Sequence, residues 1–286
     1  MLRFFKKTAK IVGAIILVLM TVCLILIHVF FKPKSDADIY EIFQEFDAIV
    51  QIDTKYIQNK KTRIISTQKE LDTTLPNIVF VHGSPGSAMD FKRYLLDKDL
   101  NKRANLISFD RVGYNKDNIG DIQTISTEAQ ILNSLISELD IPHTILVGYS
   151  YGGPVALASK KQYKKIVLCA PAIYSEVEPM FWFLNLYRWK VTRWLIPEFL
   201  KAASKEKLQH KEDLKTLEKK WVENSSNILS IHGDTDRIVP YENSLFLEEQ
   251  FSRDQFELIT LEKASHDLIW SRFDQIKKEL IKVLDD

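Results

Sequence analysis

The stretch TILVGYSYGGPVALASK, residues 144–160, decides the expected fold. It begins with a short apolar run typical of a buried strand, passes through Gly148-Tyr149-Ser150-Tyr151-Gly152, and continues as a predicted helix. Glycines two positions before and after Ser150 leave room for a sharp turn that exposes its hydroxyl. Because the motif lies between a predicted strand and a predicted helix, it indicates a nucleophilic serine rather than an idle serine in a glycine-rich turn.

Five further apolar runs are expected to form strands of the same sheet as residues 144–147. These runs cover residues 77–81, 105–109, 165–169, 227–231 and 256–260, and helices are expected at residues 126–139, 241–251 and 268–284. Short buried strands that alternate with helices indicate an α/β fold with a mostly parallel central sheet flanked by helices. Active sites in such sheets lie beyond the carboxyl ends of the strands, so the residues that follow each run are the candidate functional residues.

A serine hydroxyl needs a general base to become a nucleophile, and three histidines follow Ser150 in the chain. His266 comes after the last apolar run, which puts it at the carboxyl edge of the sheet, and it is the predicted base. His210 lies in a charge-rich helical stretch and is expected on the solvated surface. His232 is expected to be a turn residue.

The acid that orients His266 is expected after the fifth apolar run. Residues 232–240 follow that run and contain Asp234 and Asp236. Both carboxylates qualify on their position alone, since each sits at the same edge of the sheet as the predicted base.

Two backbone N–H groups are expected to stabilise a developing oxyanion. The first belongs to Tyr151, the residue after the nucleophile, and the second to the loop after the first apolar run, HGSPGS at residues 82–87. Ser84 is the predicted donor in that loop because Pro85 has no N–H. His82 is expected to brace the loop. The loop lacks the Lys-Ser or Lys-Thr that a phosphate-binding loop requires.

Together these segments resemble the α/β-hydrolase superfamily. The resemblance runs from about residue 77 to the C-terminus and rests on HGSPGS (82–87), FDRVGY (109–114), GYSYGGP (148–154), GDTD (233–236) and SH (265–266). It looks closest to the branch of esterases, meta-cleavage C–C hydrolases and proline iminopeptidase-like enzymes. The resemblance implies an α/β-hydrolase fold and a structural role for Asp110.

The resemblance also favours Asp236 as the acid, because the family's acid sits three residues after the glycine. Some relatives place the acid after the fourth strand, where Glu176 and Glu178 are lesser alternatives in this chain. Proline iminopeptidases usually have glycine where Ser84 stands, which weakens that narrower assignment.

Residues 11–31 are almost wholly apolar and would form a helix of about 31 Å, which matches the core of a bilayer. We expect a permanent transmembrane anchor; the alternative is a signal sequence that is removed. Four basic residues lie within residues 1–10 and two follow the apolar run, at Lys32 and Lys34. This excess predicts a cytoplasmic N-terminus and a catalytic domain on the outer, periplasmic or extracellular side.

The rest of the chain is expected to comprise a linker with a helix, residues 32–60, and one hydrolase domain, residues 61–286. Apolar residues at helical spacing predict the linker helix over residues 35–50, and a strand-like region follows over residues 56–67.

Residues 171–224 separate the fourth and fifth runs and are far longer than an ordinary connection. Their first half is crowded with aromatic residues, and their second half is rich in Lys and Glu. We expect a helical cap over the active site, as many relatives possess. Its aromatic residues have three interpretations: packing onto the core, lining an apolar acyl pocket, or dipping into the membrane surface.

The predicted function is ester hydrolysis through an acyl-enzyme at Ser150, with His266 and Asp236 as partners and without a metal or organic cofactor. The expected substrate is a small-molecule or lipid-like ester, and the net charge of +1 argues against nucleic acid. One alternative is amide, peptide or C–C bond cleavage on the same triad, since fold and triad do not fix the bond that is cleaved. Another is a non-catalytic binding protein with this fold.

Overall fold

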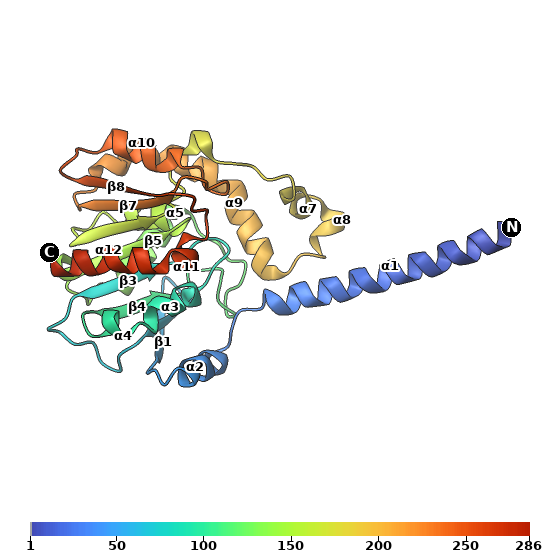
Figure 1. The fold of residues 1–286 in the computed structure, drawn as a ribbon, viewed down its shortest axis with the longest axis horizontal. Helices are drawn as coiled ribbons and strands as arrows, with labels where there is room; N and C mark the ends of the chain where they lie inside the picture. Colours follow the sequence, from blue (N-terminus) through green and yellow to red (C-terminus); the bar gives the residue numbers. More distant parts are fainter. Residues whose placement is uncertain (1) are drawn as a thin grey trace.

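The computed structural model of the protein describes residues 2–286, with side chains described from Ile11 onward. Its centre is an eight-stranded sheet in the order β1-β2-β4-β3-β5-β6-β7-β8 (Figure 1). Strands β3 to β8 pair in parallel, whereas β1 and β2 are antiparallel at one edge. The strands are β1 (Gln51–Ile57), β2 (Lys60–Ser66), β3 (Asn77–Val81), β4 (Asn105–Phe109), β5 (Thr144–Tyr149), β6 (Lys165–Cys169), β7 (Ile228–Gly233) and β8 (Phe256–Leu261). The mostly parallel sheet is therefore confirmed.

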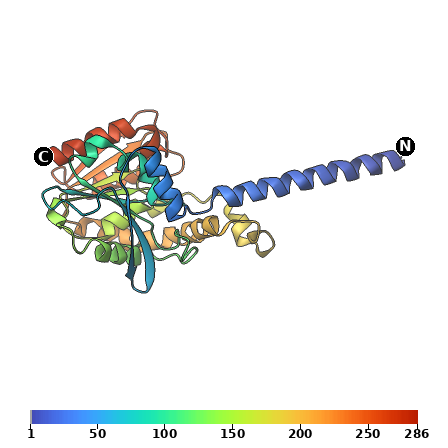
Figure 2. The same ribbon diagram turned by 90° about the horizontal axis from the view of Figure 1, so that it is seen from below.

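Helices cover both faces of this sheet, as Figure 2 shows. One face carries α2 (Asp36–Glu45), α3 (Lys92–Leu95), α4 (Lys98–Asn101), α11 (Leu268–Ser271) and α12 (Phe273–Asp285); the other carries α5 (Ile125–Leu135), α6 (Gly152–Ala158) and α10 (Glu242–Gln250). Alternate residues of a strand point to opposite faces, so Ile78 and Phe80 of β3 pack in the first layer and Val79 and Val81 in the second. This double burial explains why the central strands are continuous apolar runs.

The sheet starts earlier in the chain than the expected domain boundary at residue 61. The region predicted as one strand over residues 56–67 is part of a hairpin, in which β1 pairs with β2 from Gln51 opposite Ser66 to Ile57 opposite Lys60. Gln58 and Asn59 both have positive φ, of 49° and 61°, as a type I′ hairpin turn requires. The hairpin belongs to the same sheet as the parallel strands.

Helix α1 (Leu2–Phe30) extends away from the domain (Figure 1). Its segment Ile11–Phe30 is long and apolar enough to cross a membrane, and none of it is buried in the protein. Such a helix near the N-terminus has the length and composition of a membrane anchor or of a signal sequence. The basic side chains expected to keep the N-terminus cytoplasmic precede Ile11 and lie outside the described side chains.

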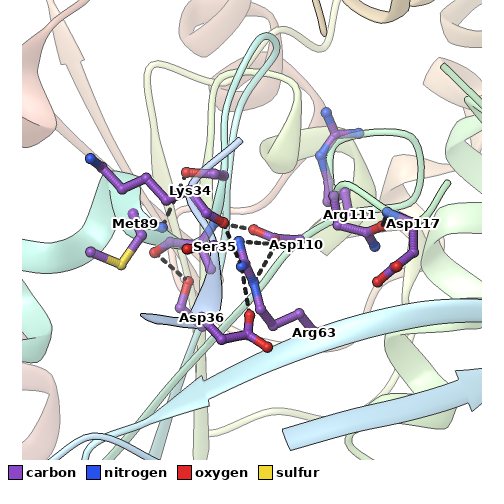
Figure 3. Close-up of polar contacts among 12 residues, drawn as sticks. Lys34, Ser35, Asp36, Arg63, Met89, Asp110, Arg111 and Asp117 are labelled. Atoms are coloured by element: carbon purple, nitrogen blue, oxygen red, sulfur yellow. Dashed lines mark hydrogen bonds and ion pairs between the residues drawn. The ribbon is translucent and has the colours of Figure 1, made fainter. Parts of the chain in front are cut away.

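The connection between α1 and the domain is tied to the sheet by a buried arginine, Arg63 of β2 (Figure 3). Its guanidinium donates to the Lys34 carbonyl at 2.7 Å and to Asp36 Oδ1 at 3.0 Å. It also donates to Asp110 Oδ2 at 2.8 Å, and Asp110 Oδ1 accepts from the Ala88 N–H at 2.8 Å. Asp110 thus links the start of α2 to the loop after β3.

The segment between β6 and β7 forms the cap. It contains α7 (Leu184–Arg188), α8 (Lys190–Arg193), α9 (Glu198–Leu217) and the short 3-10 turns Ser175–Val177 and Glu218–Glu223. Figure 1 shows α7, α8 and the start of α9 projecting beyond the carboxyl end of the sheet. The buried side of α9 carries Ala202, Glu206, His210, Leu214 and Leu217, which recur at about one-turn spacing.

Candidate active site

Ser150 lies on a strained turn between β5 and α6. Its φ is +53°, in the left-handed region that non-glycine residues rarely adopt. The turn is held by the Ser150 N–H, which donates to the Cys169 carbonyl at 2.9 Å, and by the Ser150 carbonyl, which accepts from the Gly153 N–H at 3.0 Å. A Cβ on Gly152 would lie only 2.1 Å from the Val81 carbonyl oxygen, so the motif needs glycine there.

The structure brings Ser150, His266 and Asp236 together from the ends of three strands. Ser150 follows β5, Asp236 follows β7 and His266 follows β8. His266 Nε2 lies 3.0 Å from Ser150 Oγ, and His266 Nδ1 lies 2.7 Å from Asp236 Oδ2. With the proton on Nδ1 donated to the carboxylate, Nε2 is free to accept the hydroxyl proton of Ser150.

Asp236 is the carboxylate held against His266, whereas Asp234 is exposed. The second oxygen of Asp236, Oδ1, accepts from the N–H groups of Ile238 at 2.8 Å and Val239 at 2.9 Å. Burial alone would raise the pKa of Asp236, but hydrogen bonds from His232, His266 and Val239 outweigh it and hold the pKa well below the ordinary value. The carboxylate is therefore ionised and able to stabilise an imidazolium.

His232, expected to be a turn residue, lies within β7 and is buried behind this carboxylate. Its Nδ1 lies 2.7 Å from Ser244 Oγ, and its Nε2 lies 3.0 Å from the Val239 carbonyl. His232 Nε2 is also 3.5 Å from Asp236 Oδ2. The ring supports the loop that carries the acid.

The prediction that His210 lies on the solvated surface is wrong. His210 is 1% exposed, and its Nε2 lies 3.1 Å from the Ala172 carbonyl. Burial, reinforced by Lys207, lowers the pKa of His210 to about 3, so the ring is neutral. It packs against Tyr151 with ring centroids 4.7 Å apart, because the charge-rich helix α9 turns this face toward the core.

Neither glutamate after β6 reaches His266. Glu176 is exposed, and Glu178 is buried in an ion pair with Lys207. One oxygen of Glu178, Oε2, has no hydrogen-bond partner within residues 2–286. Glu178 also lines the cavity beside Ser150, although this oxygen is itself buried.

The two predicted oxyanion donors flank Ser150. Among the described residues, the backbone N–H groups of Ser84 and Tyr151 donate to no other group. Both residues line the same cavity as Ser150. The Ser84 hydroxyl lies 2.6 Å from the hydroxyl of Tyr114, which fixes the side chain away from the backbone donor.

Arg111 braces the loop that carries Ser84, a role that the sequence did not reveal. Its guanidinium donates to the carbonyls of His82 and Gly83, each at 3.0 Å, and its backbone N–H donates to His82 Nε2 at 2.9 Å. Burial, with the charge of Arg111 added, keeps the pKa of His82 well below its ordinary value. The neutral ring then donates from Nδ1 to the Gly83 carbonyl at 2.8 Å.

The same arginine connects this loop to the cap. Arg111 forms two parallel hydrogen bonds to Glu206 of α9, at 2.8 and 3.0 Å, and Tyr114 donates to Glu206 at 2.6 Å. A second buried carboxylate, Glu128, lies 3.6 Å from Arg111. One buried cation does not neutralise two carboxylates, and burial with Glu206 nearby raises the pKa of Glu128 to about 8.

A cavity of about 350 Å³ extends from Ser150 under the cap. Its wall is mostly apolar and includes Phe181, Phe183, Leu184, Leu186, Ile196 and Leu200. This volume and its apolar wall would accommodate an apolar group larger than an acetyl.

Residues 78–278 match the family model described as the alpha/beta hydrolase family. No curated protein matches the chain. Many solved structures have the same fold, among them a bacterial membrane phospholipase A that is described as a virulence factor. It is 16% identical, and the alignment covers 100% of this chain and 98% of that chain with a TM-score of 0.66.

Two further structures illustrate the range of activities on this fold. An esterase from Exiguobacterium antarcticum is 18% identical, with 82% of this chain and 98% of that chain covered and a TM-score of 0.62. An enol-lactonase from Burkholderia xenovorans LB400 is 15% identical, with 82% and 100% covered and a TM-score of 0.62. At these identities the similarity demonstrates the fold alone.

Proposed function

The chain belongs to the alpha/beta hydrolase family, and on that premise we propose that it is a membrane-anchored serine hydrolase that cleaves carboxylic esters. The observation that carries the proposal is the continuous contact from Ser150 Oγ to His266 at 3.0 Å and from His266 to Asp236 at 2.7 Å. An isolated serine on a turn would have no reason to be strained and aligned with a base and an acid.

In the proposed reaction, Ser150 Oγ attacks the ester carbonyl while His266 Nε2 takes the hydroxyl proton. The carbonyl oxygen becomes an oxyanion that accepts hydrogen bonds from the N–H groups of Ser84 and Tyr151. His266 returns the proton to the departing alcohol, which leaves an acyl group on Ser150. Water then attacks the acyl-enzyme, with His266 as base again, and releases the carboxylic acid.

The apolar cavity supports an ester with an apolar acyl chain. Helix α1 supports residence at a membrane, with residues 11–31 as the span and residues 32–286 on the outer side. The similarity to a membrane phospholipase A over the whole of this chain favours a lipid-like substrate.

A second candidate activity, cleavage of an N-terminal residue from a peptide, rests on Glu178. Glu178 lines the cavity and its Oε2 has no hydrogen-bond partner among the described residues, so this carboxylate is a candidate acceptor for a substrate ammonium. The ester assignment is favoured because Lys207 already neutralises this carboxylate and the remaining wall is apolar.

The test uses the full chain in detergent with a panel of p-nitrophenyl esters of increasing acyl length, anilides and a proline amide. We expect turnover of esters with a preference for chains longer than acetyl, abolished by Ser150→Ala. Ser265→Ala is the matched control, because Ser265 adjoins His266 but its hydroxyl bonds to Asp267. Faster turnover of amides that is lost in Glu178→Gln would favour the peptidase, and a folded protein without any turnover would favour a binding protein.

A further inference from the structure

The outer end of the cap, residues 180–194, exposes an unusual concentration of large apolar side chains. We call this surface the cap tip; it comprises Met180, Trp182, Phe183, Leu186, Trp189, Val191 and Trp194. Trp182 is 77% exposed, Val191 79% and Trp194 70%. Contiguous exposed apolar surface of this kind marks a site that another apolar phase covers.

The charges around the cap tip indicate that the apolar phase covering it is a lipid bilayer. From residue 179 to residue 197 the chain has no acidic residue and three basic ones, Arg188, Lys190 and Arg193. Tryptophan interleaved with arginine and lysine is typical of the interface between lipid headgroups and acyl chains, where the rings enter the bilayer and the cations meet anionic headgroups.

The position of α1 brings the cap tip to the same bilayer. In Figures 1 and 2, α7 and α8 lie beside the last turns of α1. They project farther from the domain than the C-terminal end of this helix. The residues that follow α1 contact the domain: the rings of Phe31 and Phe199 stack with centroids 6.4 Å apart, and Arg63 donates to the Lys34 carbonyl and to Asp36 (Figure 3). If α1 spans the membrane, the cap tip lies at the depth of the outer leaflet.

The cavity beside Ser150 opens on this surface. Phe183 and Leu186 are 48% and 39% exposed in the cap tip, and both also line the cavity. An apolar chain that leaves the bilayer between these side chains therefore reaches Ser150 without crossing water.

We propose that the cap tip docks into the outer leaflet of the membrane that holds α1 and admits lipid esters from the bilayer directly to Ser150. This inference rests on the proposed function, because it takes α1 as a membrane span and Ser150 as the nucleophile. It goes beyond that function by assigning a second membrane contact and the route of substrate entry.

The positional test is quenching of tryptophan fluorescence by dibrominated phospholipids, with the full chain reconstituted in vesicles of phosphatidylcholine and phosphatidylglycerol. All variants keep Trp221, which is buried in the core. In addition to Trp221, one variant keeps Trp182 and Trp194, and the other keeps Trp270, which is 43% exposed on α11 in the body of the domain. The remaining tryptophans of each variant become phenylalanine. We expect at least about twofold stronger quenching in the cap variant than in the Trp270 variant.

Equal quenching in the two variants, with the chain resisting extraction by alkaline carbonate, would overturn the docking inference and leave the anchored hydrolase intact. Release of the chain by carbonate would overturn the anchor and the inference with it. Cross-linking of two copies through the cap tip, with Trp194 shielded from bromine, would identify a second copy as the occupant and also overturn the inference.

The functional test compares two substrates in the double variant Trp182→Ala/Trp194→Ala, neither residue of which lines the cavity. We expect hydrolysis of a long-chain ester embedded in vesicles to fall about tenfold, because less apolar surface enters the bilayer, while a water-soluble butyrate ester is hydrolysed within about twofold of wild type. Tyr56→Ala, at a 74% exposed aromatic residue on β1, is the matched control and should change neither rate. An equal fall on both substrates would contradict docking.

Discussion

At the carboxyl edge of the sheet, the side chains of Ser150, His266 and Asp236 are joined by hydrogen bonds. Asp236 accepts from two backbone N–H groups besides His266, and Arg111 holds two carbonyls of the oxyanion loop. In the cap tip, by contrast, large apolar side chains face outward. In the proposed function, the hydrogen-bonded first region would fix the chemistry, whereas the apolar second region would govern which apolar substrate is admitted and from where.

The largest expected effect separates two aspartates of the same loop. Asp236→Asn should lower kcat by about 10⁴-fold with the fold intact, because the amide no longer stabilises the imidazolium or the correct tautomer of His266. Asp234→Asn is the matched control and should leave kcat unchanged, since Asp234 is exposed. Steady-state hydrolysis of a soluble ester measures kcat of both variants. A similar loss of kcat in the two variants would contradict the assignment of Asp236 as the acid.

The link between the two regions is the buried pair of Arg111 and Glu206. Glu206→Ala should lower the free energy of unfolding by about 3–5 kcal/mol, because the buried Arg111 guanidinium loses both of its hydrogen bonds to a carboxylate and the Tyr114 hydroxyl loses its acceptor, with Glu128 at 3.6 Å as the remaining counter-ion. Urea unfolding measures the change. Glu198→Ala, at the exposed start of the same helix, should change stability by less than about 0.5 kcal/mol. Stability that is equal in the two variants would mean that the cap is not held through this pair.

The cavity under the cap is expected to set the preference for acyl-chain length without affecting the reaction at Ser150. Ala203 lines the cavity, so Ala203→Phe should lower kcat/KM for long-chain esters about tenfold relative to an acetyl ester. Lys205→Phe, on the exposed side of the same helix, should preserve the wild-type preference. If both chain lengths lose activity equally, Ala203 affects the nucleophile and not the substrate.

The smallest expected effect is a pH dependence of stability. The pKa of Glu128 is raised to about 8 in the folded protein, above that of an unfolded glutamate, so the folded state binds more protons between the two values. Its contribution to stability is present at low pH and is lost as the pH rises through about 8. Glu128→Gln, which stays neutral, should therefore flatten the thermal stability of the protein between about pH 5 and about pH 8. An unchanged slope would mean that Glu128 is ionised throughout.

The elements that the sequence predicted best are those with local causes. The order of strands and helices follows from apolar runs, and the positions of Ser150 and Ser84 follow from glycine-rich turns after such runs. His266 was predicted because it follows the last strand. These signals lie within a few residues of the feature that they describe.

The features that the sequence missed depend on partners far away in the chain. Arg111 and Glu206 are 95 residues apart, and nothing in the charge-rich sequence of α9 indicates that Glu206 and His210 face inward. Polar residues on a helix predict a solvated face unless their buried partners are known. The two-residue turn at Gln58 and Asn59 was missed for another reason, since neither residue is glycine.

The most direct test of the central claim is the site and rate of modification by a fluorophosphonate, followed by peptide mass spectrometry. The account predicts a single adduct on Ser150, formed rapidly in the wild type and at a greatly reduced rate in His266→Ala, because the hydroxyl then lacks its base. An adduct on another serine, or labelling of Ser150 at the same rate without His266, would contradict it.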